Sequence, residues 1–288
     1  MTIALLTNPT SAKGKGAKAR TIALEKFAAA GIDVRDLVGR DADEAHDLAR
    51  AALDDGAEAL VVCGGDGMVH LGVQLVANTG TPLGIVPAGT GNDVARYVEL
   101  SRKDPAAAVD TILRGGTRTL DLARSGERYF VTVLAAGFDA IVNERANRMT
   151  WPKGQMRYNL ATLAELRTFT PLPYVLDIDG RTIETEAMLV AVGNGPSFGG
   201  GLRITEGAAL DDGLLDVVII KAMTKLDLIR TYPKLFKGTH TTHPKYEHHP
   251  ARRVTVATPG VVSYADGERF GALPLTVECA PAALRVFA

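Results

Sequence analysis

The amino-acid sequence predicts an α/β domain followed by a mainly antiparallel β domain. In the first hundred or so residues, short apolar runs alternate with helical patterns, which is typical of βαβ units around a parallel sheet. From Thr119 onward, segments with alternating apolar and polar residues are separated by turn pairs such as Asp179-Gly180. We therefore expect domains at residues 1–118 and 119–276, with a C-terminal strand at about 277–288 that could return to the first domain.

The first domain is expected to hold a parallel sheet whose strands each lead through a loop into a helix. The predicted strands are Ile3–Leu6, Ile32–Val38, Ala59–Cys63 and Leu83–Val86. The predicted helices are Ala17–Ala30, Asp43–Asp54, Met68–Ala77, one starting at Val94, and Pro105–Arg114. Because the carboxyl ends of parallel strands meet at one edge of a sheet, the loops after these strands should lie close together.

The second domain is expected to be built from strands with two helical inserts. The predicted strands are Thr119–Arg124, Arg128–Leu134, Tyr174–Ile178, Thr182–Val192, Leu214–Ile220, Arg253–Ala257, Val261–Ala265, Thr276–Glu278 and Leu284–Phe287. The predicted inserts are Gln155–Phe169 and Lys225–Phe236. His240, His243, His248 and His249 fall in a Pro-rich basic loop without nearby ligands in zinc spacing, which disfavours a zinc site.

Composition excludes several classes of protein. Hydrophobic residues make up 46% of the chain and charged residues 23%, which excludes extensive disorder. No apolar run approaches the roughly 18–20 residues that span a bilayer, and the N-terminus lacks the features of a secretory signal. The two cysteines, Cys63 and Cys279, suit a reducing cytoplasm, and a net charge of −1 argues against a nucleic-acid partner.

Positive charge is concentrated in three stretches despite the near-neutral total. These are residues 1–20, Arg145–Arg157 around Trp151, and residues 221–253. Each stretch alone could be a solvated face. Together they favour anionic ligands or a phospholipid surface.

Three loops predict phosphate binding at the carboxyl edge of the sheet. Gly64-Gly65-Asp66-Gly67 runs from a strand into a helix, where glycines allow close approach and free N–H groups attract anions. The loops Asn8–Gly16 and Gly89–Asp93 follow two other strands. Asp66 would repel a phosphate unless a cation such as Mg²⁺ lay between them. The alternatives are a tight strand-to-helix turn, and Asn8 and Thr10 acting only as helix caps.

Known nucleotide motifs narrow the class of ligand. The chain has no Walker A pattern and no G-x-G-x-x-G pattern, which argues against common NTPases and dehydrogenases. At these loops the sequence instead resembles the diacylglycerol kinase catalytic family of lipid kinases, most closely the actinobacterial, mycobacterial-type members. The motifs are Asn8–Ser11, Gly64–Gly67, Pro87–Arg96, Ala209–Asp216 and Asp266–Glu268.

The resemblance implies an ATP- and Mg²⁺-dependent kinase that phosphorylates diacylglycerol to phosphatidic acid. It also implies a Rossmann-like, phosphofructokinase-like α/β domain with a β-sandwich domain. The residues expected to contact ATP by motif match are Asn8, Pro9, Thr10, Ser11, Ala12, Gly64, Gly65, Asp66, Gly67, Met68, Val69, His70 and Thr90, with Gly39 or a neighbour joining them. Catalytic roles map to Glu268 as proton acceptor, Asp266 beside it, and Asp66 and Asp93 through Mg²⁺. A second cation site maps to the carbonyls of Ala209 and Leu214 and to Asp212.

Simpler interpretations remain open for some of these residues. Asp211-Asp212-Gly213 could be a hairpin corner without metal, and Asp266-Gly267 could be a type I′ turn that leaves Glu268 solvated. The chain also departs from the family pattern in three places. Met68 replaces the usual threonine, His70 a common asparagine and Ala12 a usual glycine. Backbone N–H groups survive all three changes, which is compatible with activity, while a different nucleotide geometry or affinity is left open.

A lipid substrate implies docking on the inner face of the cell membrane. The stripe Met156, Leu160, Leu163, Ala164 and Leu166, with Trp151 just before it, could be either core or an interfacial anchor. The expected partners are diacylglycerol or a similar lipid and an anionic membrane surface, and a homodimer is left open. The rival functions are a sphingosine- or ceramide-type kinase, an NAD kinase, and a catalytically weak lipid- or nucleotide-binding regulator, the last suggested by Met68.

Overall fold

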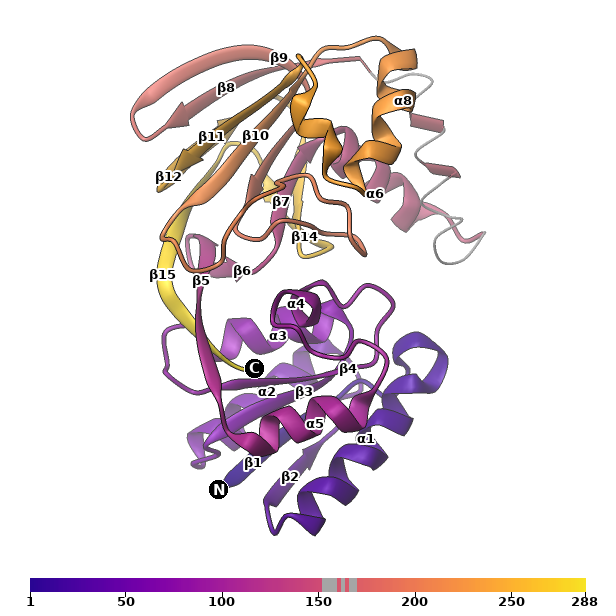
Figure 1. The fold of residues 1–288 in the computed structure, drawn as a ribbon, viewed down its shortest axis with the longest axis vertical. Helices are drawn as coiled ribbons and strands as arrows, with labels where there is room; N and C mark the ends of the chain where they lie inside the picture. The colour runs from indigo at the N-terminus through magenta and orange to yellow at the C-terminus, as the bar shows by residue number, and fades with distance from the viewer. Residues whose placement is uncertain (152–159, 162–163, 166–169) are drawn as a thin grey trace.

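The computed structural model describes all residues except 152–159, 162–163 and 166–169 (Figure 1). Its described strands pair into one 15-stranded sheet, which is parallel in the N-terminal part and antiparallel in the rest. The N-terminal part is layered α/β, and the C-terminal part is a curved arrangement of antiparallel strands (Figure 1). This arrangement confirms the predicted fold class.

The parallel strands form the centre of the α/β part. They are β1 (Thr2–Thr7), β2 (Asp33–Leu37), β3 (Ala59–Gly64) and β4 (Leu83–Pro87), in the spatial order β4-β3-β1-β2. The six residues of β3 are all buried, as expected for a parallel strand with helices on both faces.

Four helices cover the two faces of this sheet. Helices α1 (Ser11–Ala29) and α5 (Pro105–Arg114) pack together on one face, and α2 (Ala42–Asp54) and α3 (Asp66–Val76) on the other. α5 occupies its predicted range because Asp104 accepts hydrogen bonds from the N–H groups of Ala106 and Ala107, and Gly115 ends the helix in a left-handed conformation.

The rest of the chain is mainly strands. They are β5 (Thr117–Ser125), β6 (Arg128–Phe130), β7 (Val133–Gly137), β8 (Leu172–Ile178), β9 (Arg181–Gly193), β10 (Leu215–Lys221), β11 (Tyr246–Ala251), β12 (Arg253–Ala257), β13 (Val262–Ala265) and β14 (Glu268–Ala272). The described helices of this part are α6 (Phe138–Arg148), α8 (Lys225–Leu235) and the short η1 (Thr239–Thr242), whereas the short α4 (Asp93–Tyr97) belongs to the α/β part and packs near α3. Two apolar clusters fill this part, one of which lies beneath α6 and α8.

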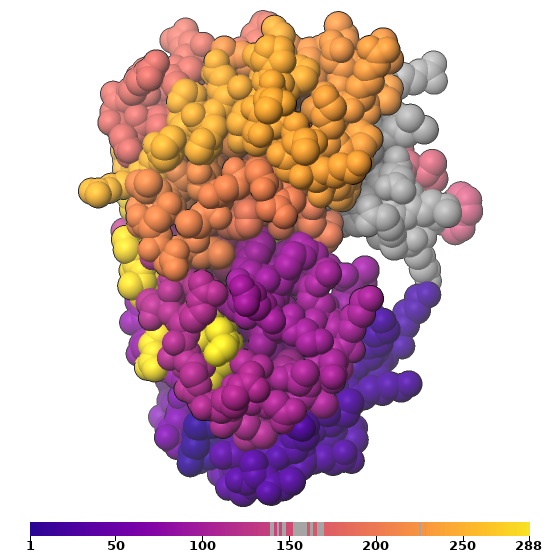
Figure 2. Space-filling model, viewed as in Figure 1, coloured from indigo at the N-terminus to yellow at the C-terminus, as the bar shows by residue number. Residues whose placement is uncertain are grey.

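A long strand, β15 (Leu275–Phe287), ties the two parts together. It pairs antiparallel with β12 and β5 and then parallel with β4, where Val286 lies opposite Leu83. The sequence predicts two short strands here, but the structure has one, with a bulge between Ala280 and Leu284. Its yellow end reaches the α/β part in Figure 1, and the last residues lie among magenta atoms in Figure 2.

The predicted single strand Arg128–Leu134 is wrong, because the chain forms two strands there. The N–H groups of Val131 and Thr132 do not continue the ladder but donate to the carboxylate of Asp266, at 3.1 and 2.8 Å. The strand is interrupted where its backbone binds this side chain. The interruption places the corner between β6 and β7 against the turn that leads to Glu268.

Further elements differ from the sequence-based expectation. Helix α6 and strand β14 are not predicted, and α1 starts earlier than Ala17, through an irregular turn. The expected histidine-rich loop is wrong: His248 and His249 lie on β11, and His240 is buried in η1. Most of the predicted helix Gln155–Phe169, with Met156, Leu163 and Leu166, lies outside the described residues.

Two observations on apolar residues are relevant to contact with a membrane. Among the described residues, no helix is both long enough and apolar enough to cross a bilayer. Several large apolar side chains are nevertheless exposed, including Trp151 and three on or next to α8.

Candidate functional site

A cavity of about 340 Å³ lies at the carboxyl edge of the parallel sheet. It is lined by Thr7, Asn8, Thr10, Ser11, Gly39, Arg40, Asp41, Ala42, Ala45, Gly65, Gly67, Met68, Leu71 and Glu268. These residues come from the end of β1, from the loops after β1, β2 and β3 together with the helices that follow them, and from the start of β14. Loops that follow neighbouring parallel strands form a crevice of this kind, which is the usual ligand-binding position in an open α/β sheet.

The loop after β1 is held in a tight conformation. The side-chain oxygen of Asn8 accepts hydrogen bonds from the N–H and the hydroxyl of Thr10, at 3.1 and 2.8 Å. A Cβ atom at Gly16 would lie 2.0 Å from the carbonyl oxygen of Asn8, so only glycine fits where α1 crosses this loop. Ala12 has a φ of 43°, in the left-handed region that favours glycine, which gives a physical reason for the usual glycine at this position.

The glycine loops after β3 and β4 touch each other. A Cβ atom at Gly89 would lie 2.4 Å from the Cα atom of Gly65, so the two backbones can approach only because both residues are glycine. Helix α3 begins directly after Gly65, with Asp66 in its first turn. The N-terminal N–H groups of α3 therefore face the cavity edge, which favours an anionic ligand there.

Asp66 links the two glycine loops through its carboxylate. Its two oxygens accept hydrogen bonds from the N–H groups of Asn92 and Asp93, at 2.8 and 2.7 Å. Burial raises the pKa of Asp66, and the negative charge of Asp93 raises it further, whereas these hydrogen bonds lower it. The net pKa is above the usual range, because burial and the nearby charge of Asp93 outweigh the two hydrogen bonds.

Asp93 is buried and binds groups from two parts of the chain. Its carboxylate pairs with Arg96 on α4 and accepts a hydrogen bond from the N–H of Gly200, at 2.7 Å. Gly200 belongs to the loop after β9, so this contact joins the α/β part to the antiparallel part. The structure gives Asp93 a bridging contact that the sequence does not indicate.

Asp266 is enclosed by hydrogen-bond donors. His70 Nδ1 lies 2.9 Å from its Oδ2, and the hydroxyl of Thr132 donates to its Oδ1 at 2.7 Å, in addition to the two backbone N–H groups described above. Burial alone would raise the pKa of Asp266, but the bonds from His70 and Thr132 outweigh it and hold the pKa below the usual range. Neither His70 nor Asp266 lines the cavity. Their pairing positions α3 against the turn that carries Glu268.

Glu268 is exposed at the mouth of the cavity. Asp266 and Gly267 both have positive φ values, so the tight turn considered from the sequence is present between β13 and β14. The turn directs Glu268 toward α3, where its Oε1 lies 3.3 Å from the position of a Cβ atom at Gly67. The same turn therefore brings a carboxylate to the edge of the helix that starts at Asp66.

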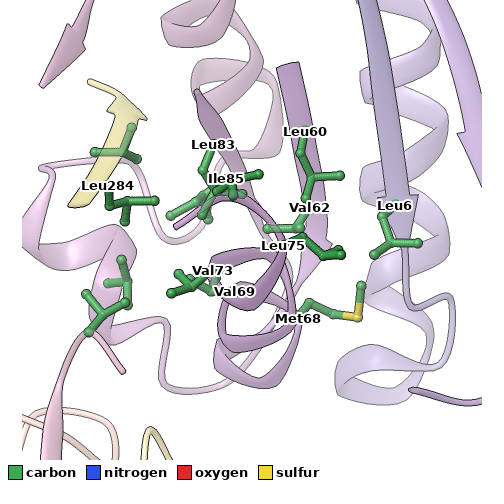
Figure 3. Packing of buried hydrophobic residues seen from close by; sticks show 14 of the residues in the cluster. Leu6, Leu60, Val62, Met68, Val69, Val73, Leu75, Leu83, Ile85 and Leu284 are labelled. Atoms are coloured by element: carbon green, nitrogen blue, oxygen red, sulfur yellow. The ribbon is translucent and has the colours of Figure 1, made fainter. Parts of the chain in front are cut away.

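Met68 packs beneath the glycine loop Gly64–Gly67. A Cβ atom at Gly64 would lie 2.4 Å from Met68 Cγ, and Met68 belongs to the apolar cluster under α3. Its side chain extends toward Leu6 in Figure 3. The departure from threonine thus supplies apolar packing at the cavity wall in place of a hydroxyl.

The structure brings together only some of the predicted nucleotide residues. Asn8, Thr10, Ser11, Gly39, Gly65, Gly67 and Met68 line the cavity. Pro9, Ala12, Gly64, Asp66, Val69, His70 and Thr90 do not, although several are adjacent to residues that do. Arg40 and Asp41 of the loop after β2, and Leu71 of α3, line the cavity without having been predicted, because only the folded chain brings them there.

The turn at residues 209–214, where the resemblance implies a second cation site, is bound by the carboxylate of Asp121. Buried Asp121 accepts hydrogen bonds from the N–H groups of Gly213 and Ala282, both at 2.7 Å, and Asp212 accepts one from Leu214 at 3.0 Å. These bonds order the turn around Ala209–Leu214, and the cation site expected there stays a prediction. Sequence reasoning missed Asp121, whose partners are far away along the chain.

No cluster of three metal-ligating side chains occurs among the described residues. Asp66 and Asp93 nevertheless influence each other electrostatically and lie beside the glycine loops. Magnesium commonly takes only one or two carboxylates and completes its shell with phosphate and water oxygens. The residues present therefore fit a cation shared with a ligand phosphate, and they do not fit a cage made of protein alone.

Comparison with known protein families identifies the family to which this chain belongs. Residues 2–125 match the diacylglycerol kinase catalytic domain, and residues 132–288 match the YegS C-terminal NAD kinase beta sandwich-like domain. A diacylglycerol kinase of Mycobacterium tuberculosis is 44% identical over 99% of this chain and 94% of its own length. This chain belongs to the diacylglycerol kinase family. A Bacillus subtilis diacylglycerol kinase is 27% identical over 94% of this chain and 90% of its own length.

Solved structures of this family and of a neighbouring one share the fold. A diacylglycerol kinase from Bacillus anthracis superposes with a TM-score of 0.80 at 24% identity, covering 99% of this chain and 96% of its own. An NAD kinase from Archaeoglobus fulgidus in complex with ATP gives a TM-score of 0.56 at 11% identity, covering 100% and 94%. At these identities the similarity concerns the fold alone.

The His70–Asp266 contact leads to a prediction about stability. We expect His70→Ala to lower the free energy of unfolding by about 1–3 kcal/mol, because a buried carboxylate oxygen loses a donor. His70→Asn should lose less, since its amide N–H₂ can donate to Asp266. Urea denaturation measures both values, with His46→Ala on the surface of α2 as control. Equal losses for His70→Ala and the control would contradict the role of this contact.

Proposed function

We propose that this chain is an ATP- and Mg²⁺-dependent kinase that transfers a phosphoryl group to the hydroxyl of diacylglycerol, giving phosphatidic acid. The observation that carries the proposal is the position of Glu268. Its carboxylate stands at the mouth of a cavity whose lining includes Gly65 and Gly67 of the glycine loop after β3, 3.3 Å from a Cβ position on Gly67. Membership of the diacylglycerol kinase family supports this choice of substrate class.

The nucleotide would occupy the cavity with its phosphates at the glycine loops. Gly65 and Gly67 leave the backbone of the α3 start uncovered, so its N–H groups can donate to phosphate oxygens. The purine end would then lie among the residues after β2, near Gly39 and Ala45. Arg40 lines this region and pairs with Glu44 in the structure, and its guanidinium would supply positive charge to a polyanion.

Asp66 and Asp93 would hold the divalent cation through one carboxylate oxygen each or through water. The cation supplies neutralisation of charge on the phosphates as the phosphoryl group moves. The chain's own part is to fix the two carboxylates: the backbone N–H groups of Asn92 and Asp93 hold Asp66, and Arg96 and Gly200 hold Asp93. Groups held in this way need little rearrangement when the ligand arrives.

Glu268 would accept the proton of the lipid hydroxyl. Phosphoryl transfer has a loose transition state, so a carboxylate near the acceptor oxygen is a sufficient base. Asp266 takes a supporting role here, because its oxygens are already bound by His70, Thr132 and two backbone N–H groups. It positions Glu268 and does not itself reach the cavity.

A product assay tests this function. Purified protein is incubated with γ-labelled ATP, Mg²⁺ and detergent micelles that contain diacylglycerol, sphingosine or ceramide, and in a separate reaction with NAD⁺. Labelled phosphatidic acid is the expected product. A labelled sphingolipid or NADP⁺ would replace the proposed acceptor, and the absence of any labelled product above that of Glu268→Gln would overturn the kinase proposal.

A further inference from the structure

Helix α8 carries an apolar stripe on its exposed side. Leu226, Ile229 and Phe236 are 55%, 52% and 45% exposed, and Pro233 is exposed as well. Their spacing of three, four and three residues places all four on one face of a helix. We call these four residues the α8 stripe. Large apolar side chains gathered on one exposed face usually mark a binding surface.

The opposite side of α8 is anchored in the protein. Thr231 and Leu235 are buried, and Leu235 packs in the apolar cluster that includes Phe138 and Val142 of α6. Both helices lie on the right-hand side of the antiparallel part in Figure 1. The α8 stripe is therefore not the inner face of a helix whose partner is missing, but a second apolar face on a helix that is already packed.

Exposed cations follow the stripe along the helix. Arg230, Lys234 and Lys237 are exposed, and none of them forms an ion pair with a residue that the structure describes. The helix has one carboxylate, Asp227, which is engaged at its first turn by the hydroxyl of Thr224, at 2.7 Å. An apolar stripe flanked by unpaired cations is the pattern of a helix that lies in the interface of an anionic membrane.

A second exposed aromatic side chain, Trp151, lies just after α6 in the chain. Trp151 is 76% exposed and follows the end of α6 by three residues. Phe138 and Val142 of α6 belong to the same apolar cluster as Leu235 of α8, so Trp151 follows a helix that shares a core with α8. Tryptophan is favoured at the boundary between lipid headgroups and acyl chains.

We infer that the α8 stripe is the surface by which this protein docks on an anionic phospholipid bilayer. The inference rests on the proposed lipid substrate, which stays within a bilayer, and it names the element that inserts. The side chains of Leu226, Ile229 and Phe236 enter the interface, while Arg230, Lys234 and Lys237 contact lipid phosphates. The net charge of the whole chain, −1, would not draw it to such a surface, so the local cations must do so.

Vesicle binding of matched variants tests this surface. Leu226→Asp/Ile229→Asp places charges on the stripe, and Arg230→Gln/Lys234→Gln removes two flanking cations. The control is Val175→Asp, which changes a residue 47% exposed on β8, toward the opposite side of Figure 1. Sedimentation with sucrose-loaded vesicles of equal parts phosphatidylcholine and phosphatidylglycerol measures the affinity, and circular dichroism checks that each variant is folded.

The expected result is about tenfold weaker vesicle binding for the stripe variant, and a smaller loss for the cation variant that high salt abolishes. The control should bind like the wild type. Unchanged binding of the stripe variant, or no vesicle binding of the wild type, would overturn the inference. Sedimentation velocity adds one more outcome: a wild-type dimer that the stripe variant converts to monomer would assign the surface to a second copy of this chain and overturn membrane docking.

The experiments distinguish an error in the docking inference from an error in the proposed kinase function. The stripe variant should phosphorylate a short-chain, water-dispersed diacylglycerol at the wild-type rate, because the cavity residues are unchanged. If the wild type binds vesicles through α8 but phosphorylates no lipid, the kinase proposal fails and the docking surface stands. If the stripe variant is as active on vesicles as the wild type, the kinase proposal stands and the docking surface fails.

Discussion

Asp66→Asn is expected to lower kcat by about a hundredfold to a thousandfold while the protein stays folded. The amide oxygen can still accept one of the two backbone N–H groups that Asp66 binds, so the contact between the glycine loops is partly kept. The negative charge is lost, and with it the affinity for the cation that neutralises the phosphates. Initial-rate kinetics over a range of Mg²⁺ concentrations measures the effect.

A surface carboxylate on the same part of the chain provides the control for Asp66. Asp110 lies on α5 and pairs with Lys26, away from the cavity residues. Asp110→Asn should leave kcat and the Mg²⁺ requirement unchanged. If Asp66→Asn were as active as this control at limiting Mg²⁺, the carboxylate of Asp66 would have no part in binding the cation.

The raised pKa of Asp66 adds a pH dependence to this prediction. Burial and the charge of Asp93 raise the pKa above the usual 3.8, so the carboxyl is protonated at a higher pH than an exposed aspartate. Because Mg²⁺ binds the ionised form, its apparent affinity should fall as the pH is lowered through this raised pKa, and the titration should disappear in Asp66→Asn. Isothermal titration with Mg²⁺ and a non-hydrolysable ATP analogue at several pH values follows the change.

Glu268→Gln is expected to lower kcat by about a hundredfold to ten-thousandfold, the usual contribution of a positioned general base. The amide has nearly the same size as the carboxylate but cannot accept the hydroxyl proton. Glu268 is exposed, so the melting temperature should stay close to that of the wild type. Nucleotide affinity should also change little. Steady-state kinetics with lipid in micelles, together with thermal denaturation, separates the two effects.

Glu127→Gln is the matched control for Glu268. Glu127 is another exposed glutamate, in the turn between β5 and β6, and it does not line the cavity. A normal kcat for Glu127→Gln and a low kcat for Glu268→Gln would place the base at Glu268. Near-normal turnover of Glu268→Gln would remove Glu268 from the proton-transfer step, and the acceptor of the proton would have to be sought elsewhere in the cavity.

Much of the fold can be predicted because local signals and tertiary packing agree. α5 has a capping aspartate, a proline at its start and a glycine at its end, and the structure begins and ends the helix at the expected residues. The strand at Arg128–Leu134 shows the opposite case. Its alternating pattern is continuous, but the backbone at Val131 and Thr132 is bound by Asp266, more than 130 positions away, and no local pattern reports such a partner.

Some residues of the candidate site can likewise be predicted from the sequence, and others cannot. Glycine loops such as Gly64–Gly67 can be found from the sequence, because close backbone approach demands glycine itself. Arg40, Leu71 and Asp121 carry no such signal, since ordinary side chains acquire these positions only through the folded chain. The family resemblance implies a catalytic role for Asp266 beside Glu268, which stays a prediction; its enclosure by four donors supports the proposal that it positions Glu268.

The central claim is that the cavity beside Asp66 and Glu268 holds a nucleotide whose phosphates meet a divalent cation. A crystal structure with a non-hydrolysable ATP analogue and Mg²⁺ tests it most directly. The account predicts the purine near Gly39, the phosphates over Gly65 and Gly67, and the ion within reach of the Asp66 carboxylate. A nucleotide bound outside this cavity, or bound in it with the ion far from Asp66, would contradict the account.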